Sequence, residues 1–403
     1  MRKSVLGAEY LACGHDASTT RFDAQLVGVG FETLQSIVEQ AESRRPMLVL
    51  DRAAAQASGL ANLIDSSPLW AGRVFDGVEP NPTIELAQEA LDASASWNPD
   101  GVVAIGGGSC IDLAKAVAVG LAHAGETEAV LHGDTAVQAA VPIVAVPTSA
   151  GSGSQATSFG VLYVAGRKRS LDHPTLRPAA VVLDARFVSA MPARAAAISG
   201  LDALCQCVES MWACRATEES RKFAAQGGRL MFENLVKAVR DREPEALQAI
   251  TLGAHLSGCA INISRTTAAH AYSYALTQHH GIPHGLAVAH ALGWVARWNA
   301  GVDPDTCAHP NGFEAAGRFI EQAAGIMGCN AHGVTAQMQR LCDELGLPPS
   351  MHSAGVRRTD LAALAQAVDP QRLSNNPRVL SQRDILACTE SQCCTDASGS
   401  SLR

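Results

Sequence analysis

Short, wholly apolar runs alternate with amphipathic stretches along the first half of the chain. The apolar runs show no polar alternation, which is typical of strands buried on both faces of a parallel sheet. The stretches between them repeat their apolar positions at the helical period, so they predict helices that cover both faces of the sheet. The predicted strands are residues 47–51, 102–105, 143–146 and 180–184, and the predicted helices include residues 33–43 and 83–96.

The pattern changes after about residue 191. Long alanine- and leucine-rich windows follow, with apolar residues at helical spacing, and they predict an all-helical domain. We therefore predict an α/β plus all-α fold. A Rossmann-like parallel-sheet nucleotide domain covers residues 1–190, and a helical domain covers residues 191–403, with a flexible tail from about residue 389. The predicted helices of the second domain include residues 196–212, 219–239, 243–262 and 313–326.

The composition narrows the class of protein. Of 403 residues, 47% are hydrophobic and 17% are charged, so the chain can bury large cores. A net charge of -8 argues against nucleic acid or an anionic membrane surface as a partner. No uninterrupted apolar run reaches the roughly 18 residues of a membrane span, and residues 1–12 form no convincing targeting segment. The 12 scattered cysteines are typical of reduced thiols, and we expect a cytoplasmic protein.

Two loops rich in glycine and serine follow predicted strands, at residues 106–109 and 147–154. The backbone amides of such loops can approach a phosphate closely, and the helix that follows the first loop adds a favourable dipole. Two such loops at the ends of adjacent strands predict a dinucleotide site, although neither carries the G-x-G-x-x-G pattern. The alternative is a pair of tight strand–helix turns. The expected cofactor contacts are Gly106, Gly107, Gly108, Ser109, Asp112, Thr148, Ser149 and Ser152.

Asp51 and a basic triplet bear on the choice of cofactor. A carboxylate at the end of a strand can accept from the adenosine ribose and would repel a 2′-phosphate, so Asp51 favours NAD over NADP. The neighbouring Arg52 argues the other way. Lys168, within the triplet 167–169, is a candidate for the cofactor phosphates, and a solvated turn is the alternative.

A carboxylate, an amide and two imidazoles are spaced as metal ligands are. Asp202 and Gln206 share one face of a predicted helix, and His270 and Tyr274 share a face of another. His284 follows a proline at a helix start. Asp202, Gln206, His270 and His284 could surround one divalent ion and leave a position open for substrate. Read singly, Asp202 could instead cap its helix and Gln206 could be solvated.

The order of these motifs resembles the iron-containing (group III) alcohol dehydrogenase family over roughly residues 20–385. The resemblance implies a dehydroquinate synthase-like architecture, NAD(P)-linked alcohol or aldehyde chemistry, Fe²⁺ or Zn²⁺ in a cleft, and a homodimer. The motifs that carry it are G-G-G-S-x-x-D-x-x-K at 106–115, P-T-x-A-G-x-G-S at 147–154, D-A-L-x-Q at 202–206, and His270 followed by P-H-G at 283–285.

Two positions depart from the family pattern. Gln206 stands where the family usually has histidine, and a neutral amide oxygen is a weaker ligand, so a metal-free nucleotide-binding relative is one alternative. Tyr274 stands where a second histidine often relays a proton. A tyrosine hydroxyl, with its ordinary pKa near 10, is a poorer base at neutral pH. His280 is the other candidate for the proton route.

Further segments, including residues 163–174, 202–210 and 260–270, resemble the phosphonoacetaldehyde reductases of phosphonate antibiotic pathways. That subgroup implies reduction of phosphonoacetaldehyde to 2-hydroxyethylphosphonate. A phosphonate excluded from water needs cationic partners, and we expect Arg265 as the main one, supported by His173 and His279. The alternatives are another small aldehyde or alcohol, maleylacetate, or lyase chemistry on the same fold.

Overall fold

The computed structural model describes residues 18–22, 25–123, 126–164 and 166–399. The N-terminal residues that we considered as a targeting segment lie outside these ranges. The chain forms two compact units. The first unit runs to Pro192 and also takes in Arg242–Gly258, and the second comprises Ala193–Asp241 and the chain from Cys259 onward.

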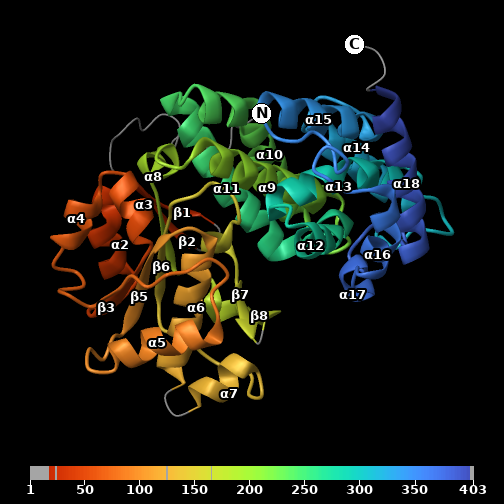
Figure 1. Ribbon diagram of the computed structural model, residues 1–403. Helices are drawn as coiled ribbons and strands as arrows, with labels where there is room; N and C mark the ends of the chain where they lie inside the picture. Colours follow the sequence, from red (N-terminus) through yellow and green to blue (C-terminus); the bar gives the residue numbers. More distant parts are fainter. Residues whose placement is uncertain (1–17, 23–24, 124–125, 165, 400–403) are drawn as a thin grey trace. The chain divides into compact units, whose positions relative to one another are not determined.

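A seven-stranded sheet forms the centre of the first unit (Figure 1). The pair β1·β2 is antiparallel and every other neighbouring pair is parallel, so the predicted parallel sheet is confirmed. In spatial order the strands are β1 (Ser18–Phe22), β2 (Gln25–Val29), β9 (Ala180–Leu183), β6 (Ile143–Pro147), β5 (Gly101–Gly106), β3 (Pro46–Leu50) and β4 (Val74–Phe75).

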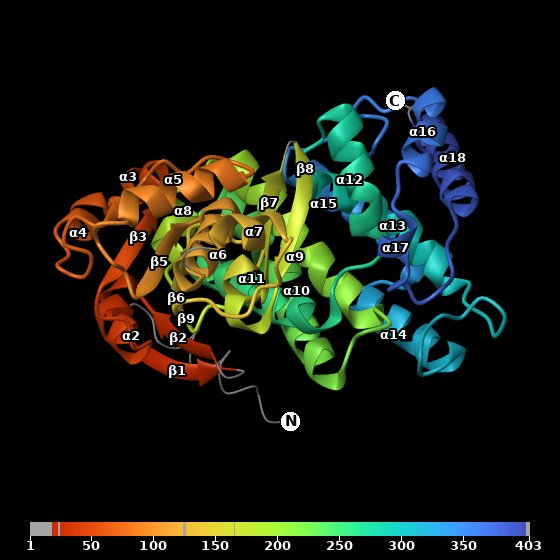
Figure 2. The same cartoon turned by 90° about the horizontal axis from the view of Figure 1, so that it is seen from below.

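The alternation of side chains along β3 shows why the strands are apolar throughout. Met47 and Val49 belong to one buried cluster, and Leu48 and Leu50 belong to another. Helices α5 (Ile84–Ser94) and α6 (Gly108–Ala122) supply the first cluster, and α2 (Leu34–Gln40) and α3 (Arg52–Ala57) supply the second (Figure 2). Both faces of the sheet are therefore covered. The remaining helices of this part are α4 (Ala61–Asp65), α7 (Thr127–His132) and α8 (Ala185–Ser189).

A two-stranded antiparallel hairpin was not predicted from the sequence. It consists of β7 (Phe159–Val164) and β8 (Arg167–Asp172). The basic triplet lies in β8, so it forms a strand and not the solvated turn considered above. The sequence of β8 is rich in charged residues and contains no apolar run that would predict a strand. It forms a strand because it pairs with β7.

The second unit is helical, and the described residues of this unit include no β-strand. Gly281 adopts a left-handed conformation (φ 64°) that ends α12, and Pro283 precedes the first residue of α13. The tail that was expected to be flexible continues α18 as far as Gly399, and α18 packs beside α16. The helices are α9 (Ala193–Trp212), α10 (Glu218–Arg240), α12 (Ala268–His280), α13 (His284–Ala300), α14 (Phe313–Gly325), α15 (Val334–Glu344), α16 (Leu361–Gln366), α17 (Pro370–Leu373) and α18 (Gln382–Gly399).

Helix α11 (Pro244–Ser264) departs from the predicted division of the chain, because its first part belongs to the first unit. The reason is a close backbone approach. A Cβ atom on Gly153 would lie 2.5 Å from the Cα atom of Gly258. By length and composition α11 could cross a membrane, but 83% of its apolar window is buried in the protein, as in a core helix, so this is weak evidence for a span.

We expect Gly258→Ala to destabilise the first unit. The new methyl group would lie 2.4 Å from the carbonyl oxygen of Gly153, and backbone atoms cannot move aside cheaply. Overpacking of this kind costs about 1–3 kcal/mol, which should lower the thermal midpoint by several degrees. Gly317→Ala is the matched control, because nothing lies within 4 Å of its Cβ position. Equal midpoints for the two variants would contradict the close approach.

Candidate active site

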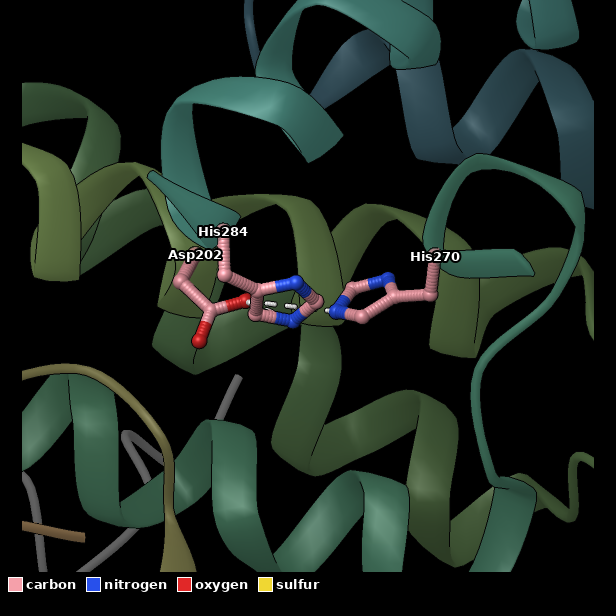
Figure 3. A group of neighbouring side chains, drawn as sticks. All are labelled: Asp202, His270 and His284. Atoms are coloured by element: carbon pink, nitrogen blue, oxygen red, sulfur yellow. Dashed lines mark hydrogen bonds and ion pairs between the residues drawn. The ribbon is translucent and has the colours of Figure 1, made fainter. Parts of the chain in front are cut away.

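Three potential metal ligands from three helices meet in the second unit (Figure 3). Asp202 comes from α9, His270 from α12, and His284 is the first residue of α13. One donor atom of each lies within 4.8 Å of the others. Asp202 Oδ1 is 3.2 Å from His270 Nε2 and 3.8 Å from His284 Nε2. Asp202 and His270 are buried, whereas the side chain of His284 is 37% exposed, so the cluster is open on the His284 side.

Gly285 explains how the start of α13 reaches α9. A Cβ atom at this position would lie 2.0 Å from the carbonyl oxygen of Ile198 and 3.1 Å from Cβ of Asp202. Only glycine permits that approach, and it brings the neighbouring His284 beside Asp202. The sequence P-H-G is therefore explained by packing as well as by ligation.

A buried carboxylate, Glu209, holds His270 in place and was not found by the sequence reasoning. Its Oε1 accepts from Thr267 N (3.2 Å), Thr267 Oγ1 (2.5 Å) and Ala269 N (2.9 Å). Its Oε2 accepts from His270 Nδ1. Trp212 Nε1 donates to Thr267 Oγ1 (3.0 Å), which completes the network. The sequence feature that could have revealed Glu209 is a carboxylate two helical turns after Asp202 in an otherwise apolar helix.

Hydrogen bonds orient both imidazoles alike. Because Glu209 binds Nδ1 of His270, we assign the proton to Nδ1, which leaves Nε2 facing Asp202. Ser273 Oγ donates to the carbonyl oxygen of His270 (2.8 Å) and lies 3.2 Å from His284 Nδ1, from which it can accept. Both Nε2 atoms are thus available on the Asp202 side. One carboxylate and two imidazoles with fixed second partners fit a divalent transition metal.

The charges of the cluster also favour a cation. Burial opposes ionisation of Asp202, but the hydrogen bond from His270 and the nearby His284 hold its pKa below the ordinary value. Burial likewise opposes a charged His270, yet Glu209 and Asp202 raise its pKa to about 10. Without metal, His270 is therefore an imidazolium between two carboxylates, which is the charge that a bound cation would replace.

Gln206 and Tyr274 both lie at this cluster. Gln206 is 4% exposed, and its side chain forms a hydrogen bond with Asp202 that helps to lower the pKa of that carboxyl group. Its role as a fourth ligand stays a prediction. The ring of Tyr274 stacks on His284, with centroids 5.4 Å apart and planes at 15°.

The other predicted substrate and proton-transfer residues have different surroundings. His280 lies 4.0 Å from Asp360, and His279 is exposed at the end of α12. Arg265 follows α11 with a left-handed backbone (φ 59°). His173, in the first unit, caps a short turn by accepting from Thr175 N (3.4 Å).

The two predicted phosphate loops are adjacent in the first unit. β5 pairs with β6 so that Gly106 lies opposite Pro147, and Thr148 N donates to the carbonyl oxygen of Gly106 (3.0 Å). A Cβ atom on Gly108 would lie 2.6 Å from Ser152 Oγ, whereas Gly107 has more space, with Ser149 Oγ at 3.6 Å. The loops meet at the carboxyl edge of the sheet, where α6 begins.

Asp112 and Lys115 hold the second loop in place. Asp112 accepts from Ser154 Oγ (2.5 Å) and Val161 N (3.0 Å), so both of its oxygens contact protein groups. The buried Lys115 ammonium donates to Ser154 Oγ at the end of the loop (3.2 Å) and to Thr157 O just after it (2.9 Å). Burial raises the pKa of Asp112. The structure thus gives Asp112 a bracing role at the position where a cofactor contact was expected.

The remaining predicted cofactor residues lie at the edges of these loops. Asp51 caps α3, with its Oδ1 accepting from Ala54 N (3.0 Å). Ser109 Oγ accepts from Asn81 N (3.3 Å). Lys168 is exposed on β8. Their contacts with a nucleotide stay predictions.

An α/β unit with phosphate-type loops, joined in one chain to a helical unit with a carboxylate–imidazole cluster, defines a metal-dependent dehydrogenase class of protein. The family model described as iron-containing alcohol dehydrogenase matches residues 26–185. The model of the C-terminal part of the Fe-containing alcohol dehydrogenase family matches residues 196–393. The chain belongs to the iron-containing alcohol dehydrogenase family, which confirms the resemblance seen in the sequence. It is an oxidoreductase of small alcohols and aldehydes.

Individual relatives support the same assignment. The chain is 35% identical over 340 residues to a phosphonoacetaldehyde reductase of Streptomyces viridochromogenes, covering 78% of this chain and 84% of that protein. It is 27% identical over 371 residues to an NAD-dependent methanol dehydrogenase of Bacillus methanolicus, covering 90% and 96%. The structure of a sulfoacetaldehyde reductase from Bifidobacterium kashiwanohense in complex with NAD⁺ has the same fold, with a TM-score of 0.80, 24% identity, and coverage of 91% and 96%.

We expect Glu209→Gln to weaken metal binding. An amide cannot accept from Thr267, Ala269 and His270 at once, so His270 loses its fixed orientation. Loss of such a partner typically raises the dissociation constant about 10- to 100-fold. Competition with a chromophoric chelator measures it. Glu344→Gln, which changes an exposed carboxylate of the same unit, is the control, and equal dissociation constants would refute the role of Glu209.

We also expect the metal affinity to increase with pH. The raised pKa of His270, about 10, stabilises the metal-free protein fully below the ordinary value of 6.5, and this contribution is lost as the pH rises through 10. A ligand must be neutral imidazole, so binding displaces this proton, and the affinity should rise up to about tenfold per pH unit between pH 7 and 9. Titrations at several pH values, corrected for the chelator, measure the slope. His332→Asn, an exposed change, should keep it, and a flat wild-type profile would contradict the prediction.

Proposed function

We propose that this enzyme reduces phosphonoacetaldehyde to 2-hydroxyethylphosphonate with NADH, as a step in phosphonate biosynthesis. The observation that carries the proposal is the 35% identity over 340 residues to a phosphonoacetaldehyde reductase. NAD rather than NADP is supported by the NAD-dependent relative and by Asp51 at the end of a strand. We also propose that the enzyme is a homodimer and that it is located in the cytoplasm.

Asp202, His270 and His284 would hold the metal, with Gln206 as a fourth ligand. When bound, Fe²⁺ or Zn²⁺ supplies a Lewis acid that polarises the carbonyl oxygen. Glu209 and Ser273 keep the two imidazoles oriented, and Gly285 lets the helix start lie close enough for ligation. These residues thus prepare the site before the substrate arrives.

The loops at 106–109 and 148–152 would bind the dinucleotide. Their backbone amides and hydroxyls suit the pyrophosphate, Asp51 suits the ribose, and Lys168 suits a phosphate. NADH, when bound, supplies the hydride for the aldehyde carbon. A proton then reaches the carbonyl oxygen through Tyr274, His280 or water, and Tyr274 is already in contact with His284.

Arg265 is the proposed main partner of the phosphonate, with His173 and His279 in support. Its left-handed backbone, unusual for a residue other than glycine, costs about 1–2 kcal/mol. Such strain is characteristic of functional positions. The segment that follows Arg265 is anchored, because Thr267 binds Glu209 through its backbone and its hydroxyl. Arg265 therefore stands beside a segment held by Glu209, the carboxylate that also orients His270.

A second candidate function is the oxidation or reduction of an uncharged alcohol or aldehyde. The similarity to an NAD-dependent methanol dehydrogenase favours it, since that similarity extends over 90% of this chain. The two candidates differ in one measurable property, which is the dependence of turnover on substrate charge.

We expect the metal-reconstituted enzyme to oxidise NADH much faster with phosphonoacetaldehyde than with acetaldehyde. Two or more charge-assisted hydrogen bonds to the phosphonate should favour it about 100-fold or more in kcat/KM. Absorbance at the NADH band measures both rates, after chelation and reloading with Fe²⁺ or Zn²⁺. Asp202→Asn should lose activity with either substrate. Equal kcat/KM values for the two aldehydes would refute the phosphonate and favour the second candidate.

A further inference from the structure

Arg372 contacts the ring of Tyr274, and this ring stacks on His284 of the candidate metal cluster. Arg372 belongs to the short helix α17, which packs against α12. Its guanidinium carbon lies 4.7 Å from the centroid of the Tyr274 ring. The same ring stacks on His284, with centroids 5.4 Å apart. Arg372, Tyr274 and His284 thus form a chain of contacts that ends at a candidate metal ligand.

The guanidinium of Arg372 is accessible to a ligand. Its side chain is 43% exposed, and its ion pair with Asp369 is long (3.8 Å) and formed between exposed groups, so it contributes little. Asp369 is also engaged elsewhere, because its Oδ1 accepts from Gln371 N (2.9 Å) and caps α17. An incoming anion would therefore displace a weak contact.

Another arginine near α12 has a closer partner. Arg357 contacts Asp360 at 3.1 Å, a carboxylate that also lies 4.0 Å from His280 of α12. Arg357 therefore offers less positive charge to a ligand than Arg372 does. Stacking on an aromatic face also orders the planar guanidinium while leaving N–H groups along its edge, which is the geometry that binds tetrahedral or planar anions bidentately.

The ring that Arg372 contacts also touches the exposed member of the cluster. His284 is the exposed member of the three ligands, and it is the one on which Tyr274 stacks. A short aldehyde whose oxygen is directed at the cluster beside His284 extends its tail along Tyr274. If that tail is anionic, it meets the guanidinium.

We propose that Arg372, in addition to Arg265, binds the anionic group of the substrate and so contributes to specificity, and that Tyr274 is the platform that orders it. This inference rests on the proposed function and extends it to a substrate class, namely small aldehydes that carry a phosphonate near the carbonyl group. The proposal also explains why an aromatic residue stands at position 274. The ring contacts both the guanidinium of Arg372 and the imidazole of His284.

The test compares Arg372→Ala and Arg372→Lys with the wild type in the full-length, metal-loaded protein. Substrates are phosphonoacetaldehyde and uncharged propanal, and the calorimetric binding of methylphosphonate is a readout that does not depend on turnover. Arg372→Ala should raise KM for phosphonoacetaldehyde about 10- to 100-fold and weaken methylphosphonate binding similarly, as for loss of a charge-assisted pair. Its kcat, and its kcat/KM for propanal, should change less than about threefold. Arg372→Lys should be intermediate, because it keeps the charge and loses the fork.

Arg340→Ala is the matched control, because it removes an exposed arginine of the same unit that pairs with Glu344 on α15. It should leave every parameter unchanged. Tyr274→Phe should keep the preference for the phosphonate, since the ring face remains, whereas Tyr274→Ala should reduce it. A loss of preference in Tyr274→Phe equal to that in Tyr274→Ala would overturn the platform.

The outcomes separate this inference from the proposed function. If the wild type shows no preference for phosphonoacetaldehyde over propanal, the proposed function fails. If the wild type shows the preference and Arg372→Ala retains it in full, the role of Arg372 is overturned while the proposed function stands. A selective increase in KM for the charged aldehyde, absent from Arg340→Ala, supports both.

Discussion

The helical unit depends on one buried carboxylate. Glu209 has no exposed surface, yet it accepts hydrogen bonds from the backbone and hydroxyl of Thr267, from Ala269 N, and from His270. An unpaired carboxylate at this depth would be strongly unfavourable, so the network is either complete or destabilising. These hydrogen bonds hold the start of α12 and set the orientation of the His270 ring. The negative charge of Glu209 also favours a positive charge at the neighbouring cluster.

Close backbone approach is the second constraint, and it explains much of the small-residue composition. Gly285 lets α13 begin against Ile198 of α9, and this contact places His284 next to Asp202. In the first unit, Gly153 and Gly258 allow α11 to pack on the second phosphate loop. Asp112 and Lys115 of α6 then hold that loop through Ser154. In both units glycine contacts and a buried charged group act together to position a loop or helix start.

The residues of the proposed active site have two separate tasks. Some bind the metal, and others distinguish one aldehyde substrate from another. Asp202, His270 and His284 supply a donor set that fits a divalent metal. Discrimination between aldehydes depends on what surrounds the exposed His284. There the ring of Tyr274 and the guanidinium of Arg372 present an aromatic face and a positive charge. A charged substrate is recognised by such a surface, whereas an uncharged alcohol would gain little from it.

The sequence by itself determined four strands of the sheet, the main helices, the two glycine- and serine-rich loops and the residues that meet in the cluster. Burial on both faces makes a parallel strand apolar throughout, and helix packing imposes its own period, so both patterns appear locally. Only the tertiary structure decided the strands β1, β2 and β4, the hairpin of β7 and β8, the division of α11 between units, and the positions of Glu209 and Arg372. Glu209 acts on His270, 61 residues away, and Arg372 on Tyr274 from a different helix. Such contacts follow from the packing of distant segments, to which no local period or motif corresponds.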